Sequence, residues 1–253
     1  MAVRPQILDR DRDMNLTVFG ELLGFGVVAG ALTTVAGMGG GLFLVLTLSL
    51  THGPLAALGI TSPALFLSNA QRAFMFRRVI EGRAVARFAL GAVPAAIGGA
   101  LVAAKLPPLA VRRHARPRGL RGAPVARRRS LRARPARLRP ALGHGRRVLS
   151  AGAGAAGFLA GPLFMALGLS GATYVGTVAL GAVVLHAARL VGYGAGGVLK
   201  PEYAPLSIAL FVGLVLGNLA GKHLRAHLTP RSEARIELGA LALAAVLGLL
   251  GIR

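Results

Sequence analysis

Long runs of residues without a charged side chain dominate this sequence. Such runs cover residues 22–71, 88–104, 148–188 and 203–221, and a last run, 236–252, carries only Glu237. One transmembrane helix needs about 20 apolar residues, so the first and third runs have room for two or more helices. The runs do not alternate apolar and polar positions as barrel strands do. The pattern predicts an all-α fold, a polytopic helical membrane protein with about seven to nine hydrophobic helices.

Composition supports the same fold class and narrows the chemistry. Hydrophobic residues make up 54% of the chain and charged residues only 15%, whereas soluble domains average about 25% charged residues. The chain has no Cys and only 8 acidic residues, which excludes thiolate metal sites and leaves little for carboxylate chemistry. We therefore expect a multi-pass protein of the cell membrane (plasma or inner membrane), with the lipid bilayer as its main partner. We expect neither a metal, nor a cofactor, nor an enzymatic activity.

The formal net charge of +22 is unevenly distributed. Residues 105–147 hold 15 of the 30 basic residues and no acidic residue, so the other 15 basic residues stand against all 8 acids. This contrast predicts four parts. They are an N-terminal polar tail (1–14), a first transmembrane repeat (15–104), an Arg/Pro-rich segment (105–147) and a second transmembrane repeat (148–253).

The two apolar parts resemble each other. In each, a Gly-rich segment (residues 37–41 and 152–157) precedes an apolar run and then a Thr. Thr177 follows Thr61 by 116 residues, and Arg189 follows Arg72 by 117. An offset shared by several motifs is the signature of an internal repeat, and we expect helix breaks near residues 37–41 and 152–161.

Charged loops indicate that the two repeats are inverted relative to each other. The loop after the first long run contains Arg77, Arg78, Arg83 and Arg87, which favours a cytoplasmic position. The matching loop of the second repeat, residues 194–205, has only Lys200 and Glu202, and the next loop is again basic. Inverted repeats are common in secondary transporters. If the two pieces that flank each Gly-rich segment both cross the membrane, or neither does, this arrangement requires an odd number of crossings within residues 105–147.

Several motifs together resemble the TauE/SafE family of membrane permeases. They are Gly-Phe-Gly-x-x-Ala-Gly at residues 24–30, Gly-Met-Gly-Gly-Gly at 37–41, Thr-Ser at 61–62, and the related segments 157–170 and 174–177. The resemblance covers about residues 16–111 and 148–252. It implies export of a small sulfur-containing anion, such as sulfite or an organosulfonate, and the paired repeats favour alternating access between two halves.

Residues 112–147 depart from the family pattern, which implies an apolar helix at this place. Arg greatly outnumbers Lys in the chain, as GC-rich codons would produce. A frameshifted stretch is therefore one interpretation, and a genuine Arg-rich loop is the other. A genuine loop would allow a second function, the binding of nucleic acid or anionic lipid by its positive charge. Nucleic acid is the weaker alternative because the segment has no aromatic residues for base stacking. The sequence leaves the oligomeric state open.

Candidate residues for the anion come from the breaks and from matched polar positions. A Gly-rich break exposes backbone N–H groups, which bind anions at helix starts, although tight packing explains such glycines equally well. Thr and Ser hydroxyls can donate hydrogen bonds to anion oxygens or to the carbonyl of the preceding helical turn. Arg side chains attract anions or extend toward the lipid headgroups. A His in a membrane helix carries a proton or has a structural role. We expect these groups around a central cavity, with Arg72 and Arg189 toward the membrane faces. The candidates are Gly37, Gly39, Gly40, Gly41, Thr61, Ser62, Asn69, Arg72, Gly154, Gly157, Thr177, His186 and Arg189.

Overall fold

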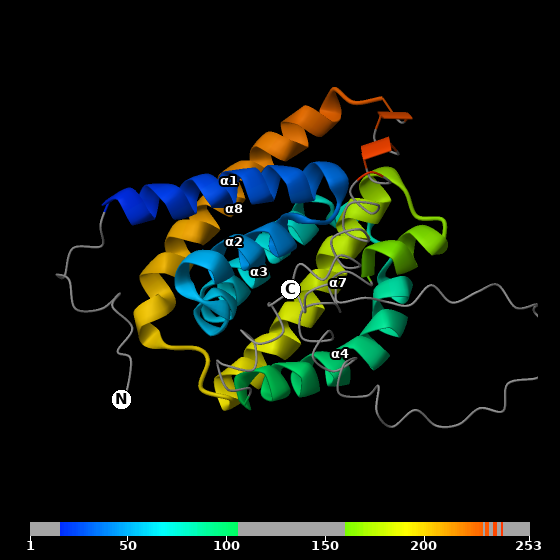
Figure 1. Cartoon of the computed structure of the whole chain (residues 1–253). Helices are drawn as coiled ribbons and strands as arrows, with labels where there is room; N and C mark the ends of the chain where they lie inside the picture. The colour runs from blue at the N-terminus through cyan, green and yellow to red at the C-terminus, as the bar shows by residue number, and fades with distance from the viewer. Residues whose placement is uncertain (1–15, 106–159, 230, 233–234, 237–238, 240–253) are drawn as a thin grey trace, which may run out of the picture.

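A computed structural model describes residues 16–105 and 160–229, together with positions 231–232, 235–236 and 239, and these residues contain no strand. The first half forms α1 (Leu16–Ala36), α2 (Gly40–His52), α3 (Pro54–Met75), the short 3-10 turn η1 (Arg77–Val79) and α4 (Gly82–Lys105). The second half forms α7 (Gly171–Ala195), η2 (Pro201–Tyr203) and α8 (Ala204–Ala226), and residues 160–166 are also helical. The predicted all-α class is confirmed (Figure 1).

Four helices of the described part are long and apolar enough to cross a membrane, namely α1, α4, α7 and the segment Pro201–Ala226 that contains α8. This number is lower than the seven to nine hydrophobic helices that the sequence predicts. Part of the predicted set, in residues 106–159 and 240–253, lies outside the described residues. Large apolar side chains are exposed on the outer faces of these helices, such as Leu90 at 81% and Val191 at 62%. An apolar outer surface suits lipid rather than water.

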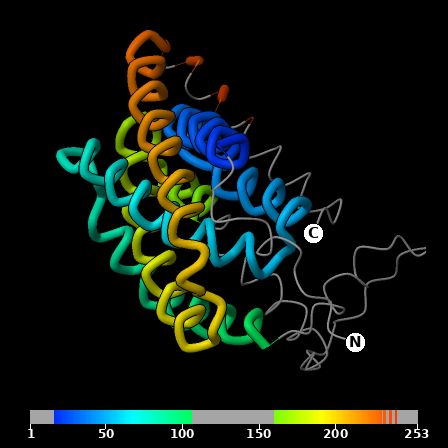
Figure 2. Tube along the Cα trace, turned by 90° about the vertical axis from the view of Figure 1, so that its left-hand side faces the viewer, coloured from blue at the N-terminus to red at the C-terminus, as the bar shows by residue number. Residues whose placement is uncertain are grey.

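Buried side chains divide the bundle into two helix groups. One core joins α1, α2, α3 and α8 through residues such as Leu22, Leu44, Ile60 and Leu210. The other cores join α4, residues 160–166 and α7. Figure 2 shows α1 and α2 on one flank of the bundle and α4 with α7 on the other. We call these the α1–α2–α3–α8 group and the α4–α7 group.

The two groups meet where α3 packs against α7, and these helices are antiparallel. Gly176, near the start of α7, lies against Phe76 at the end of α3. Gly59, near the start of α3, lies against Val198 just beyond the end of α7. The loop after α3 and the loop after α7 therefore lie at opposite ends of the bundle, as inverted repeats require.

Glycines bring α1 and α8 into direct backbone contact. A Cβ atom added to Gly26 would lie 2.6 Å from the carbonyl oxygen of Leu210, and one added to Gly221 would lie 2.9 Å from that of Ala31. Side-chain atoms cannot fit at such distances, so small residues are required where these helices approach. Gly30, Gly213 and Gly217 make similarly close contacts along the same seam. The four-residue spacing of glycines in the sequence therefore corresponds to packing here.

Candidate functional site

The predicted break at residues 37–41 is present. α1 ends at Ala36 and α2 begins at Gly40, and between them Gly37 and Gly39 have φ angles of 76° and 103°. L-residues with a side chain rarely adopt such angles. α2 then returns along α1, and Phe25 and Phe43 meet edge to face with 6.2 Å between their ring centroids. The Gly-rich segment is thus the turn of a helical hairpin.

This turn lies next to the beginning of the second repeat. A side chain at Gly37 would clash with the ring of Tyr174, whose hydroxyl lies 3.5 Å from the sulfur of Met38. Gly161 also lies against Met38 and Tyr174. The chain at Gly161 is helical, and residues 152–159, with Gly154 and Gly157, lie outside the described residues. The first break therefore contacts Gly161, at the end of the segment where the second break is predicted, and Tyr174 beyond it.

The glycines of the first break have different local surroundings. A Cβ atom at Gly40 would overlap the Thr33 hydroxyl and the Ala29 carbonyl oxygen, so Gly40 is needed for the close approach of α2 to α1. A Cβ atom at Gly41 would make ordinary contact with Leu65, at 3.5 Å. A Cβ atom at Gly39 would make only ordinary contact with Leu32, at 3.8 Å, and glycine is required there by its φ angle. For Gly40, packing is the interpretation that the geometry favours.

The hydroxyl candidates are buried and engaged within the protein. Thr61 donates a hydrogen bond to the Ala57 carbonyl at 2.7 Å, the back-bond to the preceding turn that helical Thr residues often make. Thr177 accepts a bond from the Glu81 backbone N–H at 3.0 Å. Ser62 is 3% exposed, about two turns after the start of α3. Thr177 therefore fixes the loop between α3 and α4 against α7.

Asn69 and Arg72 lie together, one turn apart, on a buried face of α3. Arg72 is 2% exposed, and its Nη2 donates to the Asn69 side-chain oxygen at 2.7 Å. The Asn69 amide nitrogen donates in turn to the Leu65 carbonyl. Among the described residues, the Nε of Arg72 has no hydrogen-bond partner. A buried guanidinium held by one neutral amide is an unusual arrangement, since buried charges are normally paired.

His186 and Arg189 repeat this spacing on α7. His186 is 9% exposed and Arg189 8% exposed. The imidazole lies close enough to Arg189 and to Arg72 to experience both positive charges. Within the described part of the chain, no residue bonds the Nδ1 of His186. The structure thus brings the matched pairs of the two repeats into one cationic cluster, which we define as Asn69, Arg72, His186 and Arg189.

The sequence predicts Arg72 and Arg189 as anion attractors toward the membrane faces, and in the structure both side chains are buried. Arg72 belongs to α3 and Arg189 to α7, the helices at which the two repeats pack together. The sequence showed the position of each arginine along its helix, at the end of an uncharged run. It gave no direct sign of the direction in which the side chain points.

A polar network on the other face of α3 was not predicted. Asn218 of α8 accepts a hydrogen bond from Thr34 of α1 at 2.9 Å and donates to Ser68 and Gln71 of α3 at 2.9 and 2.8 Å. Arg225 donates to the Val35 carbonyl at the end of α1, at 2.7 Å. Asn218, inside the uncharged run 203–221, was the available signal, because polar groups in membrane helices usually face the bundle interior.

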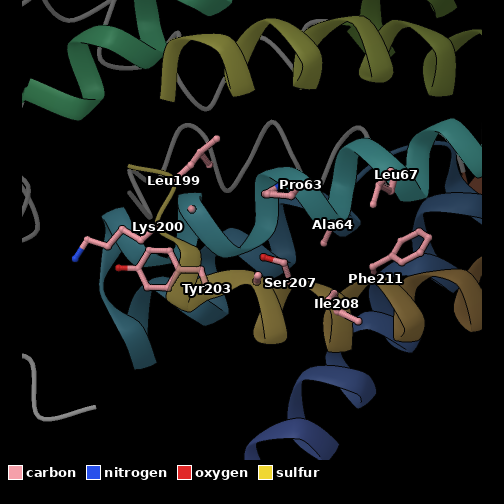
Figure 3. Close-up of a pocket in the computed structure, with 11 residues that line it drawn as sticks. Pro63, Ala64, Leu67, Leu199, Lys200, Tyr203, Ser207, Ile208 and Phe211 are labelled. Atoms are coloured by element: carbon pink, nitrogen blue, oxygen red, sulfur yellow. The ribbon is translucent and has the colours of Figure 1, made fainter. Parts of the chain in front are cut away.

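A cavity of about 240 Å³ lies away from the cationic cluster, between the first halves of α3 and α8 (Figure 3). Tyr203 lies at one end and Phe211 at the other, and the Pro63 ring faces the space between them. None of the candidate anion-binding residues lines this cavity. Its apolar wall offers little to a small anion.

Comparison with known proteins agrees with the sequence motifs. The family model described as Sulfite exporter TauE/SafE matches residues 22–250, which include every helix from α2 to α8 and most of α1. Neither a curated protein nor a solved structure matches the chain. The family match covers most of the sequence, and the helices are long and apolar enough to cross a bilayer. The chain therefore belongs to the TauE/SafE family of sulfite exporters and is a multi-pass membrane transporter.

Proposed function

We propose that this transporter exports a small anion, sulfite or an organosulfonate, across the cell membrane, and that the anion binds at Arg72 between α3 and α7. The observation that supports this most is the state of Arg72 itself. Its guanidinium is 2% exposed and is bonded to the neutral Asn69 side chain. A buried charge without a counter-charge costs several kcal/mol. An oxyanion at Arg72 would supply the missing negative charge and accept a hydrogen bond from the Nε–H group, which has no partner among the described residues.

The chemistry of the cluster fits a sulfonate or sulfite group. A guanidinium presents several N–H donors in one plane and binds oxyanions through two parallel hydrogen bonds. Asn69 holds the Arg72 plane on one side, and the unpartnered Nδ1 of His186 offers a further polar contact. The three glutamates in the described part of the chain, Glu21, Glu81 and Glu202, are all exposed. They do not compete with an anion at the cluster.

The division of the bundle into two helix groups supports alternating access. Hydrogen bonds from Asn218 and Arg225 tie α8 to α1 and α3. On the other side, Gly192 and Gly196 allow α7 to pack closely against α4. The cationic cluster lies between the groups, where α3 meets α7. Movement of one group against the other would open the cluster first to one side of the membrane and then to the opposite side.

Each repeat contributes helices to both groups, so the loops that connect the groups are the natural hinges. α3 and α4 belong to different groups and are joined by residues 76–81; α7 and α8 are joined by residues 196–203. Hinges are commonly a few loop residues that absorb the change in backbone angles. Gly197, with a φ angle of 70°, lies in the second of these loops.

The test is anion release from liposomes that contain the purified full chain. Vesicles loaded with labelled sulfite or methanesulfonate are diluted, and efflux is compared for the parent, Arg72→Gln and Arg72→Lys. We expect Arg72→Gln to abolish efflux and Arg72→Lys to retain part of it, because Lys keeps the charge without the planar donors. Arg83→Gln, at an exposed position on α4 outside the hinge loop 76–81, is the matched control. Parent-like efflux of both anions by Arg72→Gln would show that the anion binds elsewhere.

A further inference from the structure

We infer that the cationic cluster binds a proton together with its anion, on His186, so that anion export is coupled to proton movement. This inference rests on the proposed function, because it requires an anion at Arg72. It adds the coupling ion, about which membership of the family says nothing. Three observations support it: the position of His186 in α7, the positive charges around it, and the lack of a hydrogen-bond partner for its Nδ1 among the described residues.

His186 occupies the position in α7 that Asn69 occupies in α3. Both residues stand three positions before the matched arginine. Both polar atoms of the Asn69 amide are hydrogen-bonded: the oxygen accepts from Arg72 and the nitrogen donates to the Leu65 carbonyl. His186 replaces this neutral group by one that can accept a proton, and its Nδ1 has no partner among the described residues. The two repeats thus differ at this point by a titratable group inside the protein.

The charges that face His186 come from two helices. Arg189 lies three residues further along α7, and Arg72 approaches from α3. The part of α4 that packs against this region presents Phe88, Ala92 and Ala96, which do not titrate. No carboxylate in the described part of the chain is buried, since Glu21, Glu81 and Glu202 are exposed. The imidazole therefore lies in a cationic environment.

This environment links the proton to the anion. With the cluster empty, a proton on His186 would add a positive charge beside two others. An anion at Arg72 supplies negative charge at the same place and lowers the free-energy cost of protonating His186. By thermodynamic linkage, a proton then increases the affinity for the anion by the same factor as the anion increases the affinity for the proton. Where one proton enters with each anion, the apparent dissociation constant rises about tenfold per pH unit.

Methanesulfonate is the suitable probe because sulfonic acids are strong acids, so the anion itself carries no proton. The full chain is reconstituted in liposomes loaded with methanesulfonate, potassium and a pH-sensitive dye. Valinomycin with equal potassium on both sides holds the membrane potential near zero, which removes proton movement driven by voltage. We expect methanesulfonate efflux to be accompanied by alkalinisation of the vesicle interior, and half-saturation to rise about tenfold per pH unit.

The ratio of protons to anions separates the possible outcomes. In His186→Gln we expect slower efflux, and the efflux that remains should carry no protons and lose its pH dependence. Arg83→Gln should keep the parent ratio. Efflux by the parent without alkalinisation would overturn the inference and leave the proposed function intact, as would an unchanged ratio in His186→Gln. If the parent releases neither methanesulfonate nor sulfite, the proposed function itself fails and the inference fails with it.

Discussion

Gly59 and Gly176 pack in the same way, each against the loop that leaves the central helix of the other repeat. A Cβ atom at Gly59 would lie 2.8 Å from the Val198 carbonyl oxygen, and one at Gly176 would lie 2.8 Å from the Phe76 Cβ. The two glycines are 117 positions apart, the same offset that separates Arg72 from Arg189. The reciprocal contact is what a two-fold relation between inverted repeats produces.

The first prediction concerns these two glycines. Gly59→Ala and Gly176→Ala should each lower the free energy of unfolding by about 1–3 kcal/mol, because an added methyl group overpacks a close contact. Gly91→Ala is the control, since a Cβ atom there meets nothing within 4 Å. An open helical Gly→Ala change should stabilise by up to about 1 kcal/mol. Thermal unfolding in detergent measures all three, and equal midpoints would contradict the reciprocal contact.

The second prediction concerns the sides of the membrane on which the loops lie. The chain has no Cys, so each introduced Cys is the only thiol. Arg78→Cys should react with an impermeant maleimide only from the cytoplasmic side, and Glu202→Cys only from the outside, because α3 and α7 are antiparallel. The charge of the first loop sets the orientation.

Ala96→Cys is the control for this labelling, because Ala96 is fully buried between α4 and α7. It should react only after the protein is denatured. Labelling of Arg78→Cys and Glu202→Cys from the same side would exclude the antiparallel arrangement of the repeats.

The third prediction concerns Asn218. Asn218→Leu should destabilise the protein by about 1–3 kcal/mol, because Thr34 and Ser68 would each lose a buried hydrogen bond and Gln71 a partly buried one. A double-mutant cycle with Thr34→Val isolates one bond, for which we expect a coupling energy of about 0.6 kcal/mol, the average in a membrane protein. Urea or thermal unfolding in detergent gives the four stabilities. Strict additivity of the two single changes would contradict the Thr34–Asn218 bond.

Much of the fold could be predicted from the sequence because membrane helices are coded by long uncharged runs. The break at residues 37–41 was predictable because glycine is required at the positive φ angles of Gly37 and Gly39. The paired positions of Arg72 and Arg189 followed from the internal repeat. These features depend on residues that are close together in the sequence or on a constant offset.

Side-chain direction was not predictable in the same way. Asn69 and Gln71 are two residues apart on α3, yet the first belongs to the cationic cluster and the second to the Asn218 network. Which face meets which helix depends on contacts between residues about 150 positions apart, and a single sequence does not show them. For the same reason, the sequence could not distinguish exposed arginines from the buried Arg72 and Arg189.

The last prediction concerns residues 112–147, which lie outside the described residues. α4 and α7 run in the same direction, since Ile97 and Ala100 lie against Gly192, and Ala104 lies against Gly196. The chain must therefore return across the membrane between Lys105 and Gly171. Residues 160–166 form a helix of about 10 Å, at 1.5 Å per residue, which is too short for this return. An Arg at about every third position leaves no face that lipid accepts.

We therefore propose that residues 112–147 are read in a shifted frame, and that another frame of the gene codes for an apolar helix there. Resequencing the gene and translating this stretch in the other two frames is the direct measurement. We expect one frame to give at least 18 consecutive residues with few or no charges, the minimum for a span. The frame-corrected chain should insert more efficiently and export methanesulfonate faster than the present one, because the return crossing is restored. If neither frame gives an apolar stretch, the Arg-rich segment is a genuine part of the protein. The return must then be made by residues 148–159 together with the helix that follows, and binding of anionic vesicles by the segment becomes the next property to measure.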